Sequence, residues 1–145
     1  MARLHLDLPA QFQFETKLNV RVNDLNYGAH VGNDNILTLC QEARIRWYRS
    51  VGFKNEISFE GSIGQIIADA LVVYKGEAFL GDELNISIAY TDIHKYGFDL
   101  LYQILRTSDQ KEIARAKTGV ICFDYEKRKV AAIPAIVQEK LLKLN

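Results

Sequence analysis

The alternation of apolar and polar residues divides the chain into an early strand, a long helix and four later strands. Over residues 12–23, apolar side chains fall largely at every second position, which indicates a half-buried strand. From residue 34 to 50 they recur at spacings of three and four, which is typical of an amphipathic helix. Stretches rich in β-branched and aromatic residues predict further strands at 64–75, 83–93, 97–107 and 112–124. This order of elements predicts an α+β domain.

The connections between the later strands are short and contain turn-forming residues. Glycine, aspartate and serine occur in the segments 81–83, 95–97 and 108–110. Neighbouring strands are therefore expected to pair as antiparallel hairpins or a meander. Five strands around one apolar helix leave the edges of the sheet open, and edge pairing in a homodimer would close them. We predict a long helix packed against a five-stranded antiparallel sheet, in an oligomer.

The helix ends carry their own sequence signals. Asn33 or Asp34 is expected to cap the first turn of the long helix by accepting hydrogen bonds from its free N–H groups. Gly52 follows its end, where a residue with left-handed backbone conformation is favoured. Residues 134–144 begin with proline and have helical apolar spacing, so a short helix is expected to end the domain.

Length and charge narrow the classes of function. A chain of 145 residues with 48% hydrophobic and 25% charged residues fits a single globular domain, 1–145. Lys+Arg and Asp+Glu number 18 each, so no overall field attracts nucleic acid or an anionic membrane, and neither is expected as a partner. No apolar stretch has the length of a signal peptide or of a membrane span. A cytoplasmic protein is expected.

The cysteines and histidines do not form a recognisable metal motif. Cys40 and Cys122 are far apart and lack CxxC spacing, so both are expected to be buried and reduced. The three histidines, His5, His30 and His94, have no ligand-like spacing. We therefore expect neither a metal nor another cofactor.

Polar side chains concentrate in the residues that immediately precede the long helix. Free N–H groups at a helix N-terminus, here near Asn33 and Asp34, stabilise the oxyanion that forms when a carbonyl is attacked. A nearby carboxylate or histidine would supply base catalysis. Such residues are equally typical of helix caps and hydrogen-bonded loops, and spacing alone hardly separates the two interpretations. The candidate residues are Asp24, Asn26, His30, Asn33 and Asp34.

The motif DLNYGAHVGN at 24–33, followed by QEAR at 41–44, resembles the hot-dog-fold acyl-CoA thioesterases of the 4-hydroxybenzoyl-CoA thioesterase type. Tyr74, GDEL at 81–84 and the segment ARAKTGVICFD at 114–124 extend the resemblance over most of the chain. It implies a long helix wrapped by an antiparallel sheet that continues across a dimer. It also implies hydrolysis of an acyl-CoA thioester at the dimer interface, in a homodimer or a dimer of dimers.

The resemblance further implies roles for individual residues. The backbone N–H near Asn33 would hold the thioester oxygen. An apolar slot beside the helix would take the acyl group, with Tyr48 and Phe79 as candidates, although both are also typical core residues. Local cations must meet the phosphates of CoA in a neutral protein, although exposed Lys and Arg are more often solvated charges. The candidates for contacts with the nucleotide and phosphates are Lys95, Tyr96, Arg115 and Lys117.

The chain departs from the resemblance at Asn26, where related enzymes carry an acidic nucleophile or general base. An amide orients water but does not accept its proton. Asp24 together with His30 is the favoured replacement. Asp34 and Glu42 are alternatives, and Glu42 is also explained by an ion pair with the arginine four residues on.

Two other functions compete with thioester hydrolysis. Hot-dog enoyl-CoA hydratases carry His five residues after Asp and Pro after Asn, whereas His30 follows Asp24 by six residues and Tyr27 replaces the proline. An acyl-thioester binding protein without activity is the other alternative, because Asn26 lacks basic character and the fold alone does not imply catalysis. We predict an acyl-CoA thioesterase ahead of both.

Overall fold

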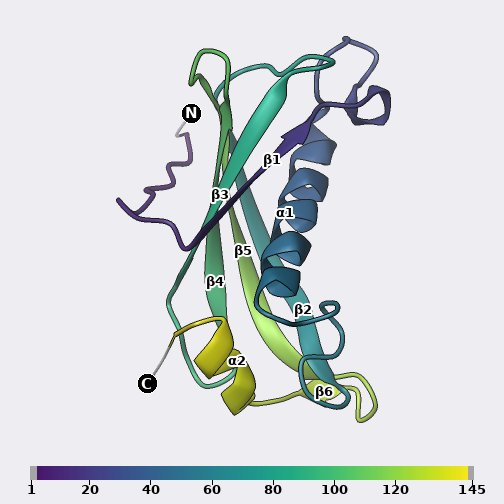
Figure 1. The fold of residues 1–145 in the computed structure, drawn as a ribbon, viewed down its shortest axis with the longest axis vertical. Coiled ribbons are helices and arrows are strands. Elements are labelled where there is room, and N and C mark those ends of the chain that lie inside the picture. The colour runs from purple at the N-terminus through teal and green to yellow at the C-terminus, as the bar shows by residue number, and fades with distance from the viewer. Residues whose placement is uncertain (1–2, 144–145) are drawn as a thin grey trace.

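The computed structural model describes residues 3–143 as one antiparallel sheet wrapped around a long helix (Figure 1). The strand order is β1-β3-β4-β5-β2, and β6 pairs with the end of β5. This is the α+β arrangement predicted from the pattern. The elements are β1 (Phe14–Asn19), η1 (Val22–Asp24), η2 (Asn33–Asn35), α1 (Ile36–Ser50), β2 (Ile63–Tyr74), β3 (Glu83–Thr91), β4 (Gly97–Arg106), β5 (Glu112–Asp124), β6 (Lys129–Val130) and α2 (Ala135–Lys140), where η marks a 3₁₀ turn.

The sheet differs from the prediction at β2. The strands β3, β4 and β5 form the expected meander, but β2 pairs with β5 and lies at an edge of the sheet. The connection 75–82 is too long for a tight turn and carries the chain from β2 across to β3 (Figure 1). The prediction of five strands also missed the two-residue strand β6.

The start of α1 also corrects the prediction. The helix begins at Ile36, and neither Asn33 nor Asp34 caps it, because both belong to the preceding 3₁₀ turn η2. The N-cap residue is Asn35, whose side chain makes no capping hydrogen bond and instead donates to Asp24 Oδ1 at 2.7 Å. This end of the helix therefore carries no side-chain cap over its first N–H groups.

The core forms where α1 packs on the concave face of the sheet. Trp47 of α1 stacks between Phe14 of β1 and Tyr90 of β3, with ring centroids 6.4 Å apart in both pairs. Both cysteines are free and buried, as expected. Burial raises the pKa of the Cys40 thiol to about 12, so this thiol is unreactive at neutral pH. No helix within residues 3–143 is long and apolar enough to cross a membrane.

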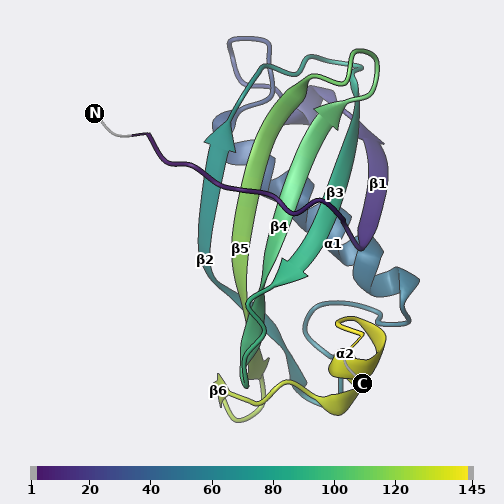
Figure 2. The same cartoon turned by 90° about the vertical axis from the view of Figure 1, so that its left-hand side faces the viewer.

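The N-terminal segment lies on the opposite side of the sheet from α1. Figure 2 shows residues 3–13 running across the strands on the face that points away from the helix. Arg115 of β5 fixes the segment by donating a hydrogen bond to Leu6 O at 2.9 Å. The outer face of the sheet is thus partly covered by the chain itself.

Candidate active site

The loop before α1 is a small hairpin that positions two of the predicted side chains. The Asn26 N–H donates to His30 O at 2.9 Å, and the Ala29 N–H donates to Asn26 O at 3.0 Å. Asn26 Oδ1 accepts a hydrogen bond from the Gly28 N–H at 2.8 Å, which fixes the amide in an Asx turn. Local hydrogen bonding therefore sets the positions of Asn26 and His30.

One hydrogen bond orients the ring of His30. Its Nδ1 lies 3.1 Å from Val31 O. Because a carbonyl oxygen only accepts, Nδ1 carries the proton in this bond, and the neutral ring presents its lone pair on Nε2. A Cβ atom added to Gly28 would lie 3.3 Å from His30 Nε2 and 3.1 Å from Asn26 Oδ1. The two polar groups thus flank Gly28.

The helix N-terminus next to this loop offers free donors. Within residues 3–143, the N–H groups of Asn33 and Asp34 donate to no protein acceptor, and both residues are exposed. Tyr74 of β2 donates its hydroxyl to Asn33 O at 2.9 Å and so holds the start of η2. Asp34 Oδ1 lies over Gly32. A Cβ atom added to Gly32 would lie 2.6 Å from this oxygen and 3.6 Å from Asn26 Cβ. Two unpaired N–H groups at the start of a helix are free to bind an anion.

Asp24 lies beneath the site, and its carboxylate is already occupied. The residue is 2% exposed and accepts hydrogen bonds from the Arg21 N–H at 2.8 Å and from Asn35 Nδ2 at 2.7 Å. The Arg21 guanidinium also pairs with it at 3.3 Å. Burial by itself would raise the pKa of Asp24, but the hydrogen bonds from Arg21 and Asn35 outweigh burial and hold the pKa below its ordinary value. Asp24 therefore ties η1 to the start of α1 and is a poor proton acceptor.

Replacing Asp24 by Asn is expected to lower the free energy of unfolding at pH 7 by about 1.5 to 3 kcal/mol, because charge-assisted hydrogen bonds are lost. Since the folded-state pKa lies below the unfolded value of about 3.9, the carboxylate stabilises above that pH and loses its effect as pH falls through the folded pKa. Urea unfolding at pH 7 and pH 3 should show the gap between wild type and Asp24→Asn narrowing in acid. The control is Asp109→Asn, which removes a half-exposed carboxylate, one of two acidic partners of Arg106, and should cost less than about 1 kcal/mol because Asp82 still pairs with the guanidinium. Equal losses in both variants would contradict this role of Asp24.

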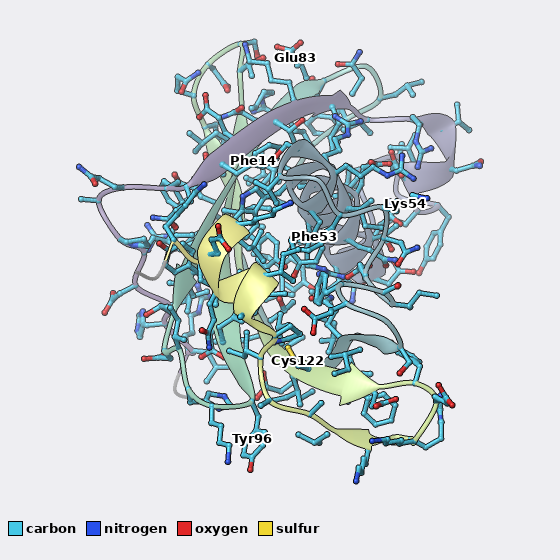
Figure 3. All side chains as sticks on the ribbon, turned by 60° about the horizontal axis from the view of Figure 1, so that its bottom comes forward. Phe14, Phe53, Lys54, Glu83, Tyr96 and Cys122 are labelled. Carbon is cyan, nitrogen blue, oxygen red and sulfur yellow. The ribbon has the colours of Figure 1, made fainter. Side chains whose placement is uncertain are left out.

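Lys95 and Tyr96 lie far from the helix N-terminus within one chain. Tyr96 O accepts a hydrogen bond from the Cys122 N–H, at the far end of β5. The opposite end of β5 pairs Ala114 with Tyr74, which contacts the site. Eight residues of β5 separate the two ends, or roughly 27 Å. In Figure 3, Tyr96 accordingly lies at the other end of the molecule from Glu83, which begins β3.

Arg115 and Lys117 lie on the outer face of β5, on the side of the sheet away from α1. Arg115 pairs with Glu112 at 2.9 Å and contacts the N-terminal segment. Lys117 pairs with Asp69 at 2.6 Å. The structure does not bring either residue to the helix N-terminus.

The two candidates for the acyl slot differ in accessibility. Tyr48 is fully buried, donates its hydroxyl to Gln65 Oε1 and packs edge-on against Phe59, with centroids 5.4 Å apart. It is a core residue, so the expectation that it contacts an acyl group is corrected. Phe79 is 45% exposed and follows Ala78, whose carbonyl accepts the hydrogen bond of the Val31 N–H. Phe79 therefore lies beside the loop of the site and keeps its place as a candidate.

A buried polar network beneath α1 was missed by the sequence analysis. Arg44 Nε donates to Glu56 Oε2 at 2.7 Å, and its guanidinium also donates to Tyr102 Oη at 3.1 Å. Gln65 donates to the same Glu56 oxygen, and Tyr102 Oη bonds Thr118 Oγ1 at 2.8 Å. The network ties the loop after α1 and the start of β2 to the helix. Its signal in the sequence was an arginine at a position where the three-four spacing calls for an apolar residue.

Comparison with known proteins gives a consistent result. The family model described as the thioesterase-like superfamily matches residues 20–141. Among solved structures, Slr0204, a 1,4-dihydroxy-2-naphthoyl-CoA thioesterase from Synechocystis, is 26% identical with a TM-score of 0.80, over 90% of this chain and 96% of that chain. SAV2348 from Staphylococcus aureus, solved in complex with CoA, is 14% identical with a TM-score of 0.81, over 96% and 87% of the two chains. Sll0410 of Synechocystis sp., which carries the name of an esterase, is 25% identical over 91% of this chain and 80% of its own length.

Proposed function

The chain belongs to the thioesterase-like superfamily, and on that premise we propose that it hydrolyses an acyl-CoA thioester at the N-terminal end of α1. The observation that carries the proposal is that one loop holds two chemical groups. The N–H groups of Asn33 and Asp34 are unpaired within the described residues, and His30, three residues before Asn33, is oriented to present Nε2. An oxyanion site next to a base is what attack of water on a carbonyl requires.

The reaction follows from these groups. The thioester oxygen accepts hydrogen bonds from the N–H groups of Asn33 and Asp34, which stabilise the negative charge that develops on it. His30 Nε2 takes a proton from water as the water oxygen bonds to the acyl carbon, and the Asn26 amide orients that water. The tetrahedral intermediate then breaks its carbon–sulfur bond, and the departing thiolate takes the proton from His30. The products are the free acid and CoA.

We propose that the protein acts as a homodimer or a dimer of dimers joined through β2. This edge strand pairs only with β5 among the described strands and exposes Ile67 and Tyr74, at 40% and 53%. At the other edge, β1, the backbone of Lys17 already accepts a hydrogen bond from Arg46. Antiparallel pairing of two β2 strands about a two-fold axis would continue the sheet and remove its free edge.

The nature of the acyl group is suggested by two features. Phe79 supplies an exposed aromatic surface beside the loop of the site. The likeness to the naphthoyl-CoA thioesterase of Synechocystis, at 26% identity, supports an aromatic acyl group as the first to test. We place Phe79 against that group, where its ring would pack on an aromatic or apolar acyl chain.

The test of this function is release of free thiol from a panel of aromatic and of short, medium and long-chain acyl-CoA esters by the purified protein. Turnover of at least one ester above the uncatalysed rate is expected. Binding of the esters without any release would favour the acyl-thioester binding protein, for which Asn26 is the supporting observation.

Replacing Asn26 by Asp is expected to raise kcat. In a His30→Ala background, the same replacement should raise kcat at least about tenfold above that of His30→Ala alone. The reason is that an aspartate oxygen accepts the Gly28 N–H as the amide does and leaves a second oxygen free to act as base. Steady-state kinetics of Asn26→Asp, His30→Ala and the double variant measure this. A double variant as slow as His30→Ala on every ester would contradict the placement of residue 26 beside the attacking water.

A further inference from the structure

The hydroxyl of Tyr74 binds one particular peptide group of the candidate active site. β2 and α1 run in opposite directions, so the last residue of β2 lies at the end of the molecule where α1 begins (Figure 2). There the Tyr74 hydroxyl donates a hydrogen bond to Asn33 O at 2.9 Å. Asn33 O and the N–H of Asp34 belong to the same peptide group. Tyr74 therefore contacts the group that carries one of the two free N–H donors.

The planarity of this peptide group fixes where its two ends point. The bond between Asn33 and Asp34 is trans, and in a trans peptide the C=O and N–H bonds point in opposite directions. The Asp34 N–H therefore points away from the carbonyl that Tyr74 holds. At the start of a helix this direction leads out of the first turn, where the N–H has no acceptor among residues 3–143.

The same hydrogen bond makes the Asp34 N–H a stronger donor. Resonance joins the peptide nitrogen to the carbonyl oxygen, so a hydrogen bond accepted by the oxygen draws electron density away from the nitrogen. Hydrogen bonds on the two ends of a peptide group therefore strengthen one another, by about 10–30% per bond. In the proposed reaction the Asp34 N–H donates to the thioester oxygen, whose negative charge grows as the transition state forms. A stronger donor at this position stabilises the transition state more than the bound substrate.

The loop before α1 does not depend on this hydroxyl for its position. The Val31 N–H donates to Ala78 O at 2.9 Å, and Asn35 Nδ2 donates to Asp24 Oδ1 at 2.7 Å. These bonds hold the chain on both sides of the peptide group. Tyr74 is 53% exposed, and an exposed hydrogen bond contributes only modestly to stability because water replaces it. Loss of the hydroxyl should therefore leave the fold intact and weaken the donor.

We propose that Tyr74 is a positioning residue of the thioesterase reaction, which orients and polarises the Asn33–Asp34 peptide so that the Asp34 N–H stabilises the oxyanion. The inference rests on the proposed function. It gives a role to a tyrosine at the exposed end of an edge strand, 41 positions along the chain from the residue that it binds. In this role Tyr74 acts through the peptide group and needs no contact with the thioester.

Replacing Tyr74 by Phe is expected to lower kcat for the best acyl-CoA about tenfold, with KM within about twofold of wild type. The variant keeps the ring and loses only the hydroxyl, so its urea unfolding curve should lie close to that of wild type. Steady-state measurement of thiol release gives both constants. An unchanged kcat, or a change confined to KM, overturns the proposal.

The matched control is Tyr125→Phe, which removes the same kind of hydrogen bond near the other end of β2. The Tyr125 hydroxyl donates to Gln65 O, a backbone carbonyl close to the start of that strand. Because Gln65 lies far along β2 from the helix N-terminus, this variant should keep kcat within about twofold of wild type. An equal fall in kcat in both variants would mean that loosening β2 lowers the rate, and it would overturn the role of the Asn33–Asp34 peptide.

Fluorinated tyrosines at position 74 separate polarisation from simple tethering. Fluorine makes the phenol more acidic and therefore a stronger hydrogen-bond donor, with little change in size. With 2-fluorotyrosine or 3-fluorotyrosine in place of Tyr74, kcat should rise in the order of phenol acidity, by up to about threefold. The measurement is made at a pH at which each phenol is protonated. The same kcat with all three phenols overturns the proposal.

A spectroscopic measurement separates failure of this inference from failure of the proposed function. The probe is the analogue of 2-naphthoyl-CoA in which a CH₂ group replaces the thioester sulfur, so that the carbonyl binds but is not cleaved. Hydrogen bonding lowers the stretching frequency of a carbonyl, so the bound probe should absorb at lower frequency in wild type and Tyr125→Phe than in Tyr74→Phe. If the wild type hydrolyses none of the esters, the function fails, and this comparison decides on Tyr74. Equal frequencies in all three proteins, or no binding of the probe, overturn the inference.

Discussion

Replacing His30 by Ala is expected to lower kcat for the best acyl-CoA by a factor of about 10² to 10⁴, with KM within a few-fold of wild type. In the proposed reaction this residue removes the proton of the attacking water, an interaction made as the transition state forms. The hydrogen bond from Nδ1 to Val31 O holds the ring so that Nε2 stays available. Because the ring is partly exposed and makes one protein hydrogen bond within the described part of the chain, its loss should cost little stability. Thiol release measured across substrate concentrations separates kcat from KM.

The matched control is His94→Ala. His94 is exposed and lies in the turn between β3 and β4. Its Nδ1 accepts a hydrogen bond from the Tyr96 N–H at 3.2 Å. Its replacement should leave kcat unchanged, because it lies at the far end of the sheet from η2. Circular dichroism and urea unfolding of both variants should match wild type. A His30→Ala protein with wild-type kcat would remove this residue from the reaction and leave Asp34 as the exposed carboxylate nearest the helix N-terminus.

The sequence predicted those parts of the fold that depend on neighbours along the chain. Alternation and three-four spacing located α1 and the long strands to within a few residues, because each pattern reflects one face of one element. The pairing of β2 with β5 was missed, since it joins residues about 50 positions apart and no local signal encodes it. Antiparallel pairing of consecutive strands was predicted from turn residues, and it holds where the connections are short, between β3, β4 and β5.

The site shows the same division. Asn26 and His30 come together through backbone hydrogen bonds within six residues, which the clustering of polar residues indicated. The predicted caps at Asn33 and Asp34 were wrong because a 3₁₀ turn intervenes, and that turn leaves their N–H groups without an acceptor in residues 3–143. Tyr48 was predicted to contact the acyl group because the helical pattern does not reveal its burial. That burial results from packing against Phe59 and from the hydrogen bond to Gln65 of β2.

Replacing Arg44 by Met is expected to lower the free energy of unfolding by about 3 to 5 kcal/mol, because one partner of a buried ion pair is lost. Arg44 is 4% exposed. Burial opposes its charge, but Tyr102 and Glu56 outweigh burial and raise the pKa of the guanidinium further above its ordinary range, so it stays charged. Without it, the Glu56 carboxylate has no cation in a site where its side chain is 15% exposed, and Tyr102 Oη loses a donor. Urea unfolding measures the loss, provided that the slope of the free energy of unfolding against urea concentration is unchanged.

Two comparisons decide whether the loss comes from the unpaired charge. Arg46→Met, two residues along the same helix, removes an exposed pair with Glu42 at 3.1 Å together with exposed hydrogen bonds to Thr16 and Lys17 of β1, and should cost about 1 kcal/mol or less. Arg44→Met/Glu56→Gln should be more stable than Arg44→Met alone, since the double variant buries no uncompensated carboxylate and the amide that replaces it still accepts the hydrogen bond from Gln65. If the double variant is as unstable as the single one, the loss reflects the packing of the Arg44 side chain and not the pair. If Arg44→Met costs no more than Arg46→Met, the network does not hold the start of β2 to α1.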